Sequence, residues 1–167
     1  MNETVMPWIQ WLQDQPWTTS WRESAWGYPA IETGHVVSII LFAGFVVMMD
    51  LRLVGLAFKE TPFSYVQSRL FPWQMAGMAL SSVTGLALMV IDPLRFYTNI
   101  FFWMKMAMLV VAGANAMAFH LTTYKSVAAW DREVRTPFRA RMAGAASLVL
   151  WAAIIVSGRL IAYNWFK

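Results

Sequence analysis

Four polar side chains stand out in an otherwise apolar chain, because their types and spacing allow chemistry inside a helix bundle. His35 and Asp50 lie 15 residues apart, and so do Lys105 and His120. Fifteen residues of α-helix climb about 22 Å and return to within about 60° of the starting direction. If each pair belongs to one helix, that helix carries a polar group near either end of a single face.

The His35 end of this pattern has the residue types of a haem b site. A neutral imidazole can ligate haem iron, and Glu32, one helical turn earlier, is placed to orient the ring or to receive a proton. The amine of Lys105, in its deprotonated form, is the second candidate iron ligand. Guanidinium groups bind carboxylates bidentately, so Arg95 and Arg159 are the candidate partners of the haem propionates.

The elements that must position these groups are membrane helices. Of the 167 residues, 59% are hydrophobic and 13% are charged, and four uncharged stretches cover residues 33–49, 70–91, 106–124 and 142–158. Since about 20 apolar residues cross a bilayer core, we predict transmembrane helices near 31–57, 73–91, 97–123 and 139–163. Proline interrupts a helix, so Phe71-Pro72 is expected to mark the break before the second of them. The short second connection favours an all-α, integral-membrane four-helix up-down-up-down bundle, formed by residues 29–167 as one domain.

Residues 1–28 differ from the rest, because they carry five of the ten tryptophans among polar residues. Tryptophan prefers the membrane–water boundary, and Val5, Trp8, Ile9 and Leu12 share one helical face. This segment is therefore expected to form an N-terminal interfacial helix on the membrane surface. An ordered cap packed over the end of the bundle is equally compatible with the sequence.

The bundle topology restricts how the polar groups pair. The first and third helices of such a bundle run in the same direction, so if His35 is level with Lys105, Asp50 is level with His120. The two histidines then lie near opposite membrane boundaries and cannot share one haem iron. The expected pairs are His35 with Lys105, and Asp50 with His120.

The second of these pairs is expected to belong to a structural polar cluster. Ionisable groups inside membrane helices are costly, and they usually face the bundle interior and pair with one another. Such a cluster would fix the register of the helices, whereas a proton relay or a second cofactor is the alternative. Its expected members are Asp50, Arg52, Asn115 and His120.

The basic residues indicate the orientation in the membrane. Eight Lys and Arg residues belong to the first and third connections and the adjoining helix ends, and four belong to the opposite side. Because positive residues are retained in the cytoplasm, we expect a multi-pass protein of the bacterial inner membrane with both termini in the periplasm. The basic residues form no polar domain, so nucleic acid is not an expected partner. The absence of cysteine excludes c-type haem, iron–sulfur clusters and thiol catalysis.

Three segments carry a resemblance to known sequences. The strings WGYPAIETGH at 26–35, DLRLVG at 50–55 and FWMK at 102–105, followed by Asn115 and Phe119-His120, resemble an uncharacterised family of small bacterial four-helix inner-membrane proteins. The chain is also similar, more weakly, to the haem-dependent membrane protoporphyrinogen oxidases, which implies haem b binding at His35 and Lys105. It differs from those oxidases after the first helix, where it has DLRL in place of a Pro-Arg-Leu segment.

Two classes of function follow from these features. The first is a haem b protein that exchanges electrons with a quinone or a periplasmic redox partner. The second is a noncatalytic membrane subunit or a small-solute transport protein, in which a Glu32–Lys105 ion pair with His35 beside it joins helices or lines a pathway. A quinone or metal site at the same residues also remains open. Besides membrane lipid, a second copy of the chain is an expected partner, because residues 143–147 are small enough for close helix packing.

Overall fold

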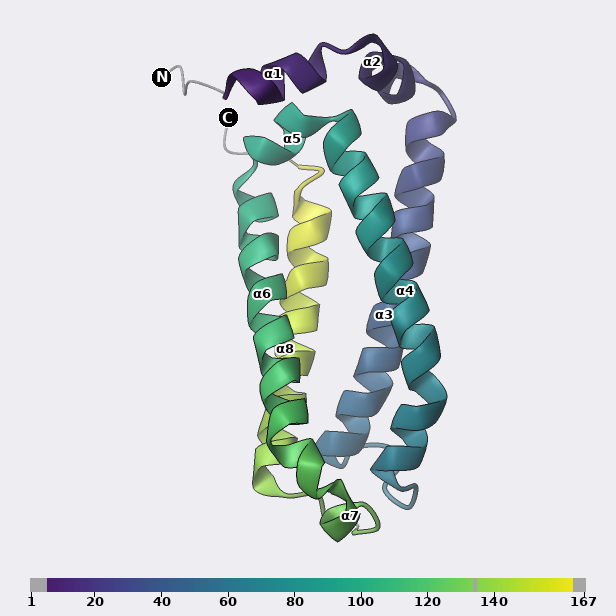
Figure 1. The fold of residues 1–167 in the computed structure, drawn as a ribbon, viewed down its shortest axis with the longest axis vertical. Helices are drawn as coiled ribbons and strands as arrows, with labels where there is room; N and C mark the ends of the chain where they lie inside the picture. Colours follow the sequence, from purple (N-terminus) through teal and green to yellow (C-terminus); the bar gives the residue numbers. More distant parts are fainter. Residues whose placement is uncertain (1–5, 134, 164–167) are drawn as a thin grey trace.

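The computed structural model describes residues 6–133 and 135–163, and in these ranges every regular element is a helix (Figure 1). Four long helices run alternately up and down, which confirms the predicted all-α bundle. By length and composition, each of them is able to cross a membrane. They are α3 (Gly27–Val54), α4 (Phe63–Ile91), α6 (Ile100–Leu121) and α8 (Phe138–Leu160).

The N-terminal residues form a packed cap over one end of the bundle, which we call the cap end. Helices α1 (Pro7–Gln13) and α2 (Pro16–Glu23) lie across it, above α5 (Pro93–Tyr97) (Figure 1). The side chain of Ile9 is buried beneath the cap, and Nη1 of Arg22 donates a hydrogen bond of 3.0 Å to the carbonyl of Ile91 at the end of α4. All five tryptophans of this segment remain exposed. This segment is therefore ordered and packed over the bundle, and its exposed tryptophans remain available to a membrane surface, so the interfacial helix stays a prediction.

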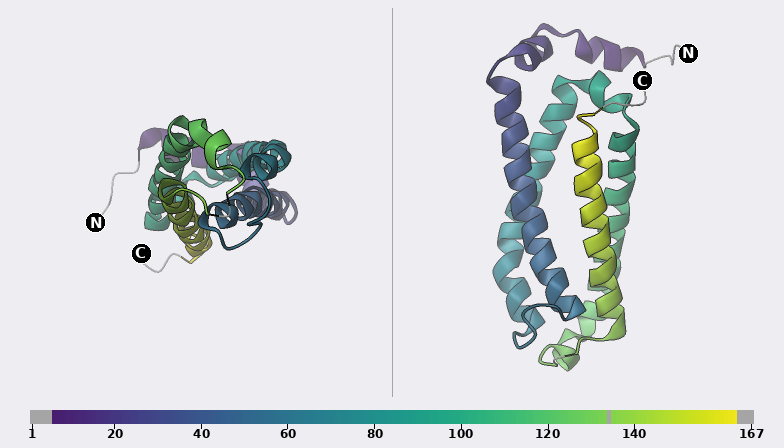
Figure 2. Two further views of the ribbon diagram at one scale, coloured as in Figure 1. Left: turned by 90° about the horizontal axis from the view of Figure 1, so that it is seen from below. Right: turned by 180° about the vertical axis from the view of Figure 1, so that it is seen from behind.

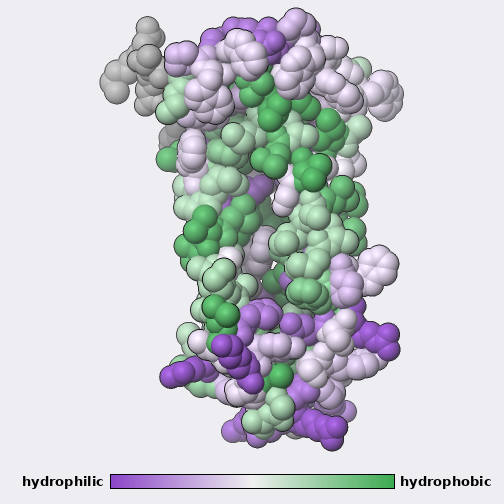
Figure 3. All heavy atoms as spheres, in the orientation of Figure 1, coloured by the Kyte–Doolittle hydropathy of each residue, from purple (hydrophilic) through white to green (hydrophobic). Residues whose placement is uncertain are grey.

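The bundle consists of two helix pairs joined along one side. α3 packs along α4 and α6 along α8, and the two pairs meet through α3 and α8. Seen from behind, α3 and α8 converge toward the end that carries α7 (Val127–Trp130), which we call the α7 end, and separate toward the cap end (Figure 2). On the front, the space-filling view shows a hollow between α6 and α4 with hydrophilic atoms at its floor (Figure 3).

Two glycines allow the close helix contacts and fix their register. A Cβ atom on Gly77 of α4 would lie 3.0 Å from the backbone nitrogen of Phe42 on α3. On α8, a Cβ atom on Gly144 would lie 3.2 Å from the carbonyl oxygen of Asp50. Small residues at such crossings let membrane helices approach backbone to backbone. Phe42 is therefore level with Gly77, and Asp50 is level with Gly144.

The buried apolar side chains form two separate clusters along the bundle axis. The middle cluster consists of Ala43, Val46, Ala112, Trp151 and Ile154. The second cluster lies nearer the α7 end and consists of Met49, Leu53, Phe63, Val66, Phe119, Trp130 and Ala140. Aromatic rings contribute to both, through Phe42 against Trp151 and Phe63 against Phe119.

Helix α4 begins at Phe63, ten residues before the predicted start at 73, which corrects that boundary. The break expected at Phe71-Pro72 does not occur, because Pro72 is accommodated inside the helix. The first turn is stabilised from outside the helix, since the backbone nitrogen and the hydroxyl of Ser64 donate to the Asp131 carboxylate at 2.8 and 2.5 Å. A carboxylate at a helix N-terminus also interacts favourably with the helix dipole.

Candidate functional site

His35 is held against α4 in a defined orientation. Its Nδ1 atom lies 3.0 Å from Oγ1 of Thr84. The Thr84 hydroxyl donates its own proton to the Leu80 carbonyl, 2.7 Å away in the preceding turn. With that proton engaged, the Thr84 oxygen accepts from Nδ1–H of His35, and the backbone of Ser81 also hydrogen bonds to the ring. In the neutral imidazole the lone pair is consequently on Nε2, the atom that remains available to a metal ion.

A glycine provides the space that the imidazole ring occupies. Gly85 follows Thr84 on α4, and a Cβ atom there would lie 2.9 Å from Cε1 of His35. Carbon atoms do not approach so closely without displacement, so any side chain at this position would push the ring away. Thr84 and Gly85 together thus determine where Nε2 of His35 lies.

Lys105 of α6 extends toward the same region. Side chains in an α-helix tilt toward its N-terminus, and α6 begins at the cap end. The lysine lies against Gly158 of α8, where an added Cβ atom would be 3.6 Å from Nζ. Within the described part of the chain, Nζ has no hydrogen bond or ion pair, and it interacts electrostatically with His35. The structure therefore brings His35 and Lys105 within electrostatic reach of each other.

Arg95 and Glu32 lie toward the cap end from His35. Nη1 of Arg95 donates a hydrogen bond of 3.0 Å to the hydroxyl of Tyr28, and the guanidinium lies over the tyrosine ring. Tyr28, Glu32 and His35 follow the i, i+4, i+7 spacing of one helix face. Arg95 is therefore placed on the His35 face of α3, and Glu32, between them, is exposed.

Arg159 also lies at the cap end, near the end of α8. Its side chain is exposed, and Nη2 donates a hydrogen bond of 3.0 Å to the hydroxyl of Tyr163. Among the residues that the structure describes, no carboxylate forms an ion pair with Arg159 or Arg95. Both guanidinium groups thus keep donors for an anionic group.

The predicted pair of Asp50 and His120 does not form. Nδ1 of His120 donates to the Ala116 carbonyl at 2.9 Å, and Nε2 accepts a hydrogen bond of 3.1 Å from the amide of Gln67. Both ring nitrogens therefore have partners, as expected for a histidine that joins two helices. The register explains the correction: Asn115 donates to the carbonyl of Ala143, beside the residue that contacts Asp50. Asp50 is consequently level with Asn115 rather than with His120.

Asp50 itself is deeply buried, with 6% of its surface exposed. Ser147 of α8 is the side chain that interacts with its carboxyl group. The Oδ2 atom is buried and has no hydrogen-bond partner among the described residues. A buried oxygen in this condition is costly unless something outside the chain satisfies it.

Arg52 does not join Asp50 either, although the two lie on the same helix. Nε of Arg52 donates to the carbonyl of Thr61 at 2.6 Å, and Nη2 lies 3.4 Å from the carbonyls of Asp131 and Glu133. Its side chain is 1% exposed. Arg52 therefore joins the two connections at the α7 end. The predicted polar cluster does not form, because its members bind different partners.

The residues that orient these groups were not recognised from the sequence. Thr84 and Gly85 position His35, Gln67 binds His120, and Asp131 stabilises the start of α4. The predicted helix began at residue 73 and so excluded Gln67. A helix extended past Pro72 would have placed Gln67 two turns before Gln74, on the same face. Nothing in the sequence indicates that Gly85 contacts an imidazole ring.

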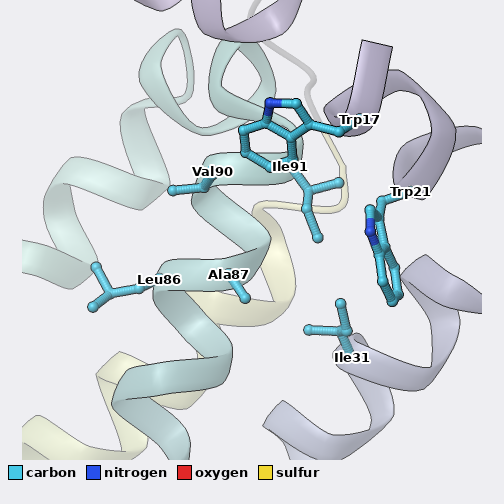
Figure 4. A pocket seen from close by; sticks show the side chains of 7 residues that line it. All are labelled: Trp17, Trp21, Ile31, Leu86, Ala87, Val90 and Ile91. Atoms are coloured by element: carbon cyan, nitrogen blue, oxygen red, sulfur yellow. The ribbon is translucent and has the colours of Figure 1, made fainter. Parts of the chain in front are cut away.

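A pocket of about 350 Å³ lies under the cap, one turn from His35 (Figure 4). Ile31 precedes His35 by four residues, and the α4 residues that line the pocket follow directly after Gly85. The indole nitrogen of Trp21 lies on the edge of its ring that faces Ala87 and Ile91. The pocket is otherwise apolar, and its lining residues are Trp17, Trp21, Ile31, Leu86, Ala87, Val90 and Ile91.

Comparison with known sequences places the chain in a family. It belongs to a family of unknown function (DUF6644), whose model matches residues 28–164. This range includes nearly all of the four long helices and every site residue predicted from the sequence, whereas Trp17 and Trp21 of the pocket precede it. No curated protein and no solved structure matches the chain. The expected membership of an uncharacterised family is thereby confirmed, whereas the comparisons add no support for the similarity to haem-dependent oxidases.

Proposed function

We propose that this protein is a multi-pass protein of the bacterial inner membrane that binds haem b near the cap end and takes part in membrane electron transfer. The observation that carries the proposal is the state of His35. Thr84 accepts from Nδ1–H, Gly85 leaves room for the ring, and Nε2 keeps a free lone pair. An imidazole fixed by a hydrogen bond on one nitrogen is the arrangement that haem and metal proteins use for a ligand.

The residues around His35 fit the rest of a haem. Nε2 of His35 and Nζ of Lys105 in its uncharged form, which has no partner in the described chain, are the groups that would hold the iron. Arg95 and Arg159 at the cap end would bind the propionates through their remaining N–H donors. Haem b, when bound, supplies one-electron redox chemistry.

The proposed electron partner is a lipid-soluble quinone. The apolar pocket under the cap lies one turn from His35, and flat rings stack on indole side chains such as those of Trp17 and Trp21. The indole N–H of Trp21 is the donor that a quinone carbonyl could accept. A periplasmic redox protein docking on the exposed cap is the second candidate partner.

The proposed orientation puts the cap end on the periplasmic side. The basic residues of the first and third connections lie at the α7 end, and positive residues are retained in the cytoplasm. Helix α1 and the C-terminal end of α8 both lie at the cap end (Figure 1). The haem site would then lie near the periplasmic boundary, where Glu32 is exposed and able to exchange protons with water.

A second candidate function is a noncatalytic membrane subunit or a small-solute transport protein. It is favoured by His120, whose two ring nitrogens are both used in helix–helix and local hydrogen bonds. In this function His35 would only join α3 to α4 through its hydrogen bond to Thr84, as His120 joins α6 to α4 through Gln67, and the chain would hold no cofactor.

Absorption spectra distinguish the two functions. The protein, purified from haem-replete cells, is expected to show a Soret band and sharp visible bands after reduction. His35→Ala should remove most of the bound haem, and His120→Ala, which changes the other histidine of the chain, should keep most of it. A colourless wild-type protein contradicts the proposal. Retention of haem in His35→Ala together with its loss in His120→Ala would place the site at the α7 end.

A further inference from the structure

A layer of polar side chains crosses the bundle between its two apolar clusters. Asp50 on α3 is level with Gly144, and Asn115 on α6 bonds to the neighbouring carbonyl of Ala143. Ser147 is one turn along α8 and interacts with the Asp50 carboxyl. Gln74 is three residues before Gly77 on α4, which places its backbone level with about residue 45 of α3, about 7.5 Å toward the cap end from Asp50. Each long helix thus contributes one oxygen-bearing side chain.

The layer contains acceptors without donors. Oδ2 of Asp50 and Oε1 of Gln74 are both buried, and neither has a hydrogen-bond partner among the described residues. The amide nitrogen of Asn115 is already used by the Ala143 carbonyl, which leaves its oxygen for another ligand. Buried polar atoms in native proteins nearly always have a partner, so a group that attracts oxygen is required here.

No basic side chain of the described chain neutralises Asp50. Nε and Nη2 of Arg52 donate to the carbonyls of the two connections at the α7 end, and its buried Nη1 has no hydrogen-bond partner among the described residues and forms no ion pair with Asp50. Lys105 is ten residues before Asn115 on α6, about 15 Å along the axis, and extends toward the cap end. His120 is bonded on both nitrogens. An isolated carboxylate inside a membrane bundle needs a compensating positive charge.

We propose that this layer is a binding site for a small monovalent cation of the sodium type. The ligands are Oδ2 of Asp50, Oε1 of Gln74, Oδ1 of Asn115 and the Ser147 hydroxyl. Hard cations take carboxylate, amide and hydroxyl oxygens as ligands. A single carboxylate compensates one positive charge, whereas a divalent ion would leave an unbalanced charge in the bundle. The absence of a His, Cys, Asp or Glu cluster in the described residues agrees with a site of this kind.

The proposal does not depend on haem. The His35 region lies 15 residues toward the cap end, beyond the middle apolar cluster. A cation in the layer would join all four helices at a level where the hydrophobic contacts are interrupted.

Sodium binding is tested on the purified protein in detergent. Binding of ²²Na⁺ and the melting temperature are measured in NaCl and in choline chloride at equal ionic strength and constant pH. The wild type is expected to bind ²²Na⁺ and to melt at higher temperature in NaCl. Asp50→Asn should lose at least tenfold in bound ²²Na⁺ and should melt at one temperature in both salts. Glu60→Gln, which changes an exposed carboxylate in a connection, should behave as the wild type.

Several outcomes would overturn the proposal. These are a wild type that binds no ²²Na⁺, or an Asp50→Asn protein that binds as much as the wild type. If the wild type is indifferent to sodium and Asp50→Asn is equally stable, the carboxyl is neutral and holds a proton instead. Should Asp50→Asn fail to fold, Gln74→Met and Ser147→Ala provide the test, since both must weaken sodium binding. Unchanged affinity in these two variants also contradicts the site.

Discussion

A Cβ atom on Gly85 would lie 2.9 Å from Cε1 of His35. The Cε1 edge of the His35 ring therefore points at the backbone of α4, in a space that exists because the residue after Thr84 has no side chain. The position of Nε2 is fixed from α4, although the histidine belongs to α3. This relationship makes Gly85 a positioning residue whose role can be separated from that of the ligand.

Gly85→Ala is expected to displace His35 and to lower the haem content several-fold. Overpacking at a helix contact costs about 1–3 kcal/mol in stability, so a folded protein should still be obtained. Haem content is measured from the Soret absorbance per protein. Gly113→Ala is the matched control, because an added Cβ there has nothing within 4 Å. Equal haem content in the two variants would show that the ring does not need this space.

If the proposed haem is bound at His35, Thr84→Val is expected to raise its midpoint potential. Loss of the acceptor for Nδ1–H makes the imidazole a weaker electron donor, which destabilises the ferric form. Redox titration followed at the visible bands measures the change, and Thr84→Ser, which keeps the hydroxyl, should restore the wild-type potential. A Thr84→Val protein with an unchanged potential would mean that His35 does not ligate the iron through Nε2.

Gln67 and His120 should show a coupling energy in a double-mutant cycle. Interhelical hydrogen bonds in membrane proteins contribute about 0.6 kcal/mol on average and at most about 1.7. The cycle uses Gln67→Leu and His120→Leu and measures unfolding in detergent. Asp50→Asn combined with His120→Leu serves as the control and should be additive, because these two side chains do not bond to each other. A coupling energy between Asp50 and His120, with none between Gln67 and His120, would support the Asp50–His120 pair predicted from the sequence.

Asp131→Ala should destabilise the first turn of α4 by about 1 kcal/mol, since it removes the acceptor of the Ser64 backbone N–H. Hydrogen exchange at residues 63–67 should rise accordingly, and Asp131→Asn should recover part of the protection. Glu133→Ala is a suitable control, because only the backbone carbonyl of that residue is used by Arg52. Equal exchange in all three variants would contradict the capping role.

Reporter fusions test the orientation. A fusion after Glu133 should report the cytoplasm, and a fusion at the C-terminus should report the periplasm, because the basic residues are concentrated in the first and third connections. A cytoplasmic C-terminal reporter, with the Glu133 fusion on the same side, would mean that α8 does not cross the membrane.

The sequence predicted the bundle well, because hydrophobic length is a direct physical requirement for crossing a bilayer. It predicted the start of α4 poorly, since Pro72 was assigned to a helix break and the membrane tolerates proline within a helix. Equal 15-residue spacings suggested that Asp50 and His120 share a level. The register is set instead by Gly77 and Gly144, which the spacing of polar residues does not report.

The candidate site was predicted in part for a similar reason. His35 and Lys105 reach each other because the lysine side chain extends along Gly158 toward the cap end, and this compensates for the difference in level. Their partners were missed because hydrogen bonds such as His35 to Thr84 connect positions 49 residues apart. Only the packing of α3 on α4 brings such positions together.

The two helix pairs are joined through α3 and α8, and this determines how molecules can reach the interior of the bundle. The side between α4 and α6 is not closed by helix packing, and a hollow lies there (Figure 3); in a membrane-spanning bundle this side would face the hydrocarbon of the bilayer. A hydrophobic molecule that partitions into the membrane can therefore enter sideways from the lipid, without passing the cap or the charged connections. Access to the interior would then depend on the composition of the surrounding bilayer rather than on concentrations in the water on either side.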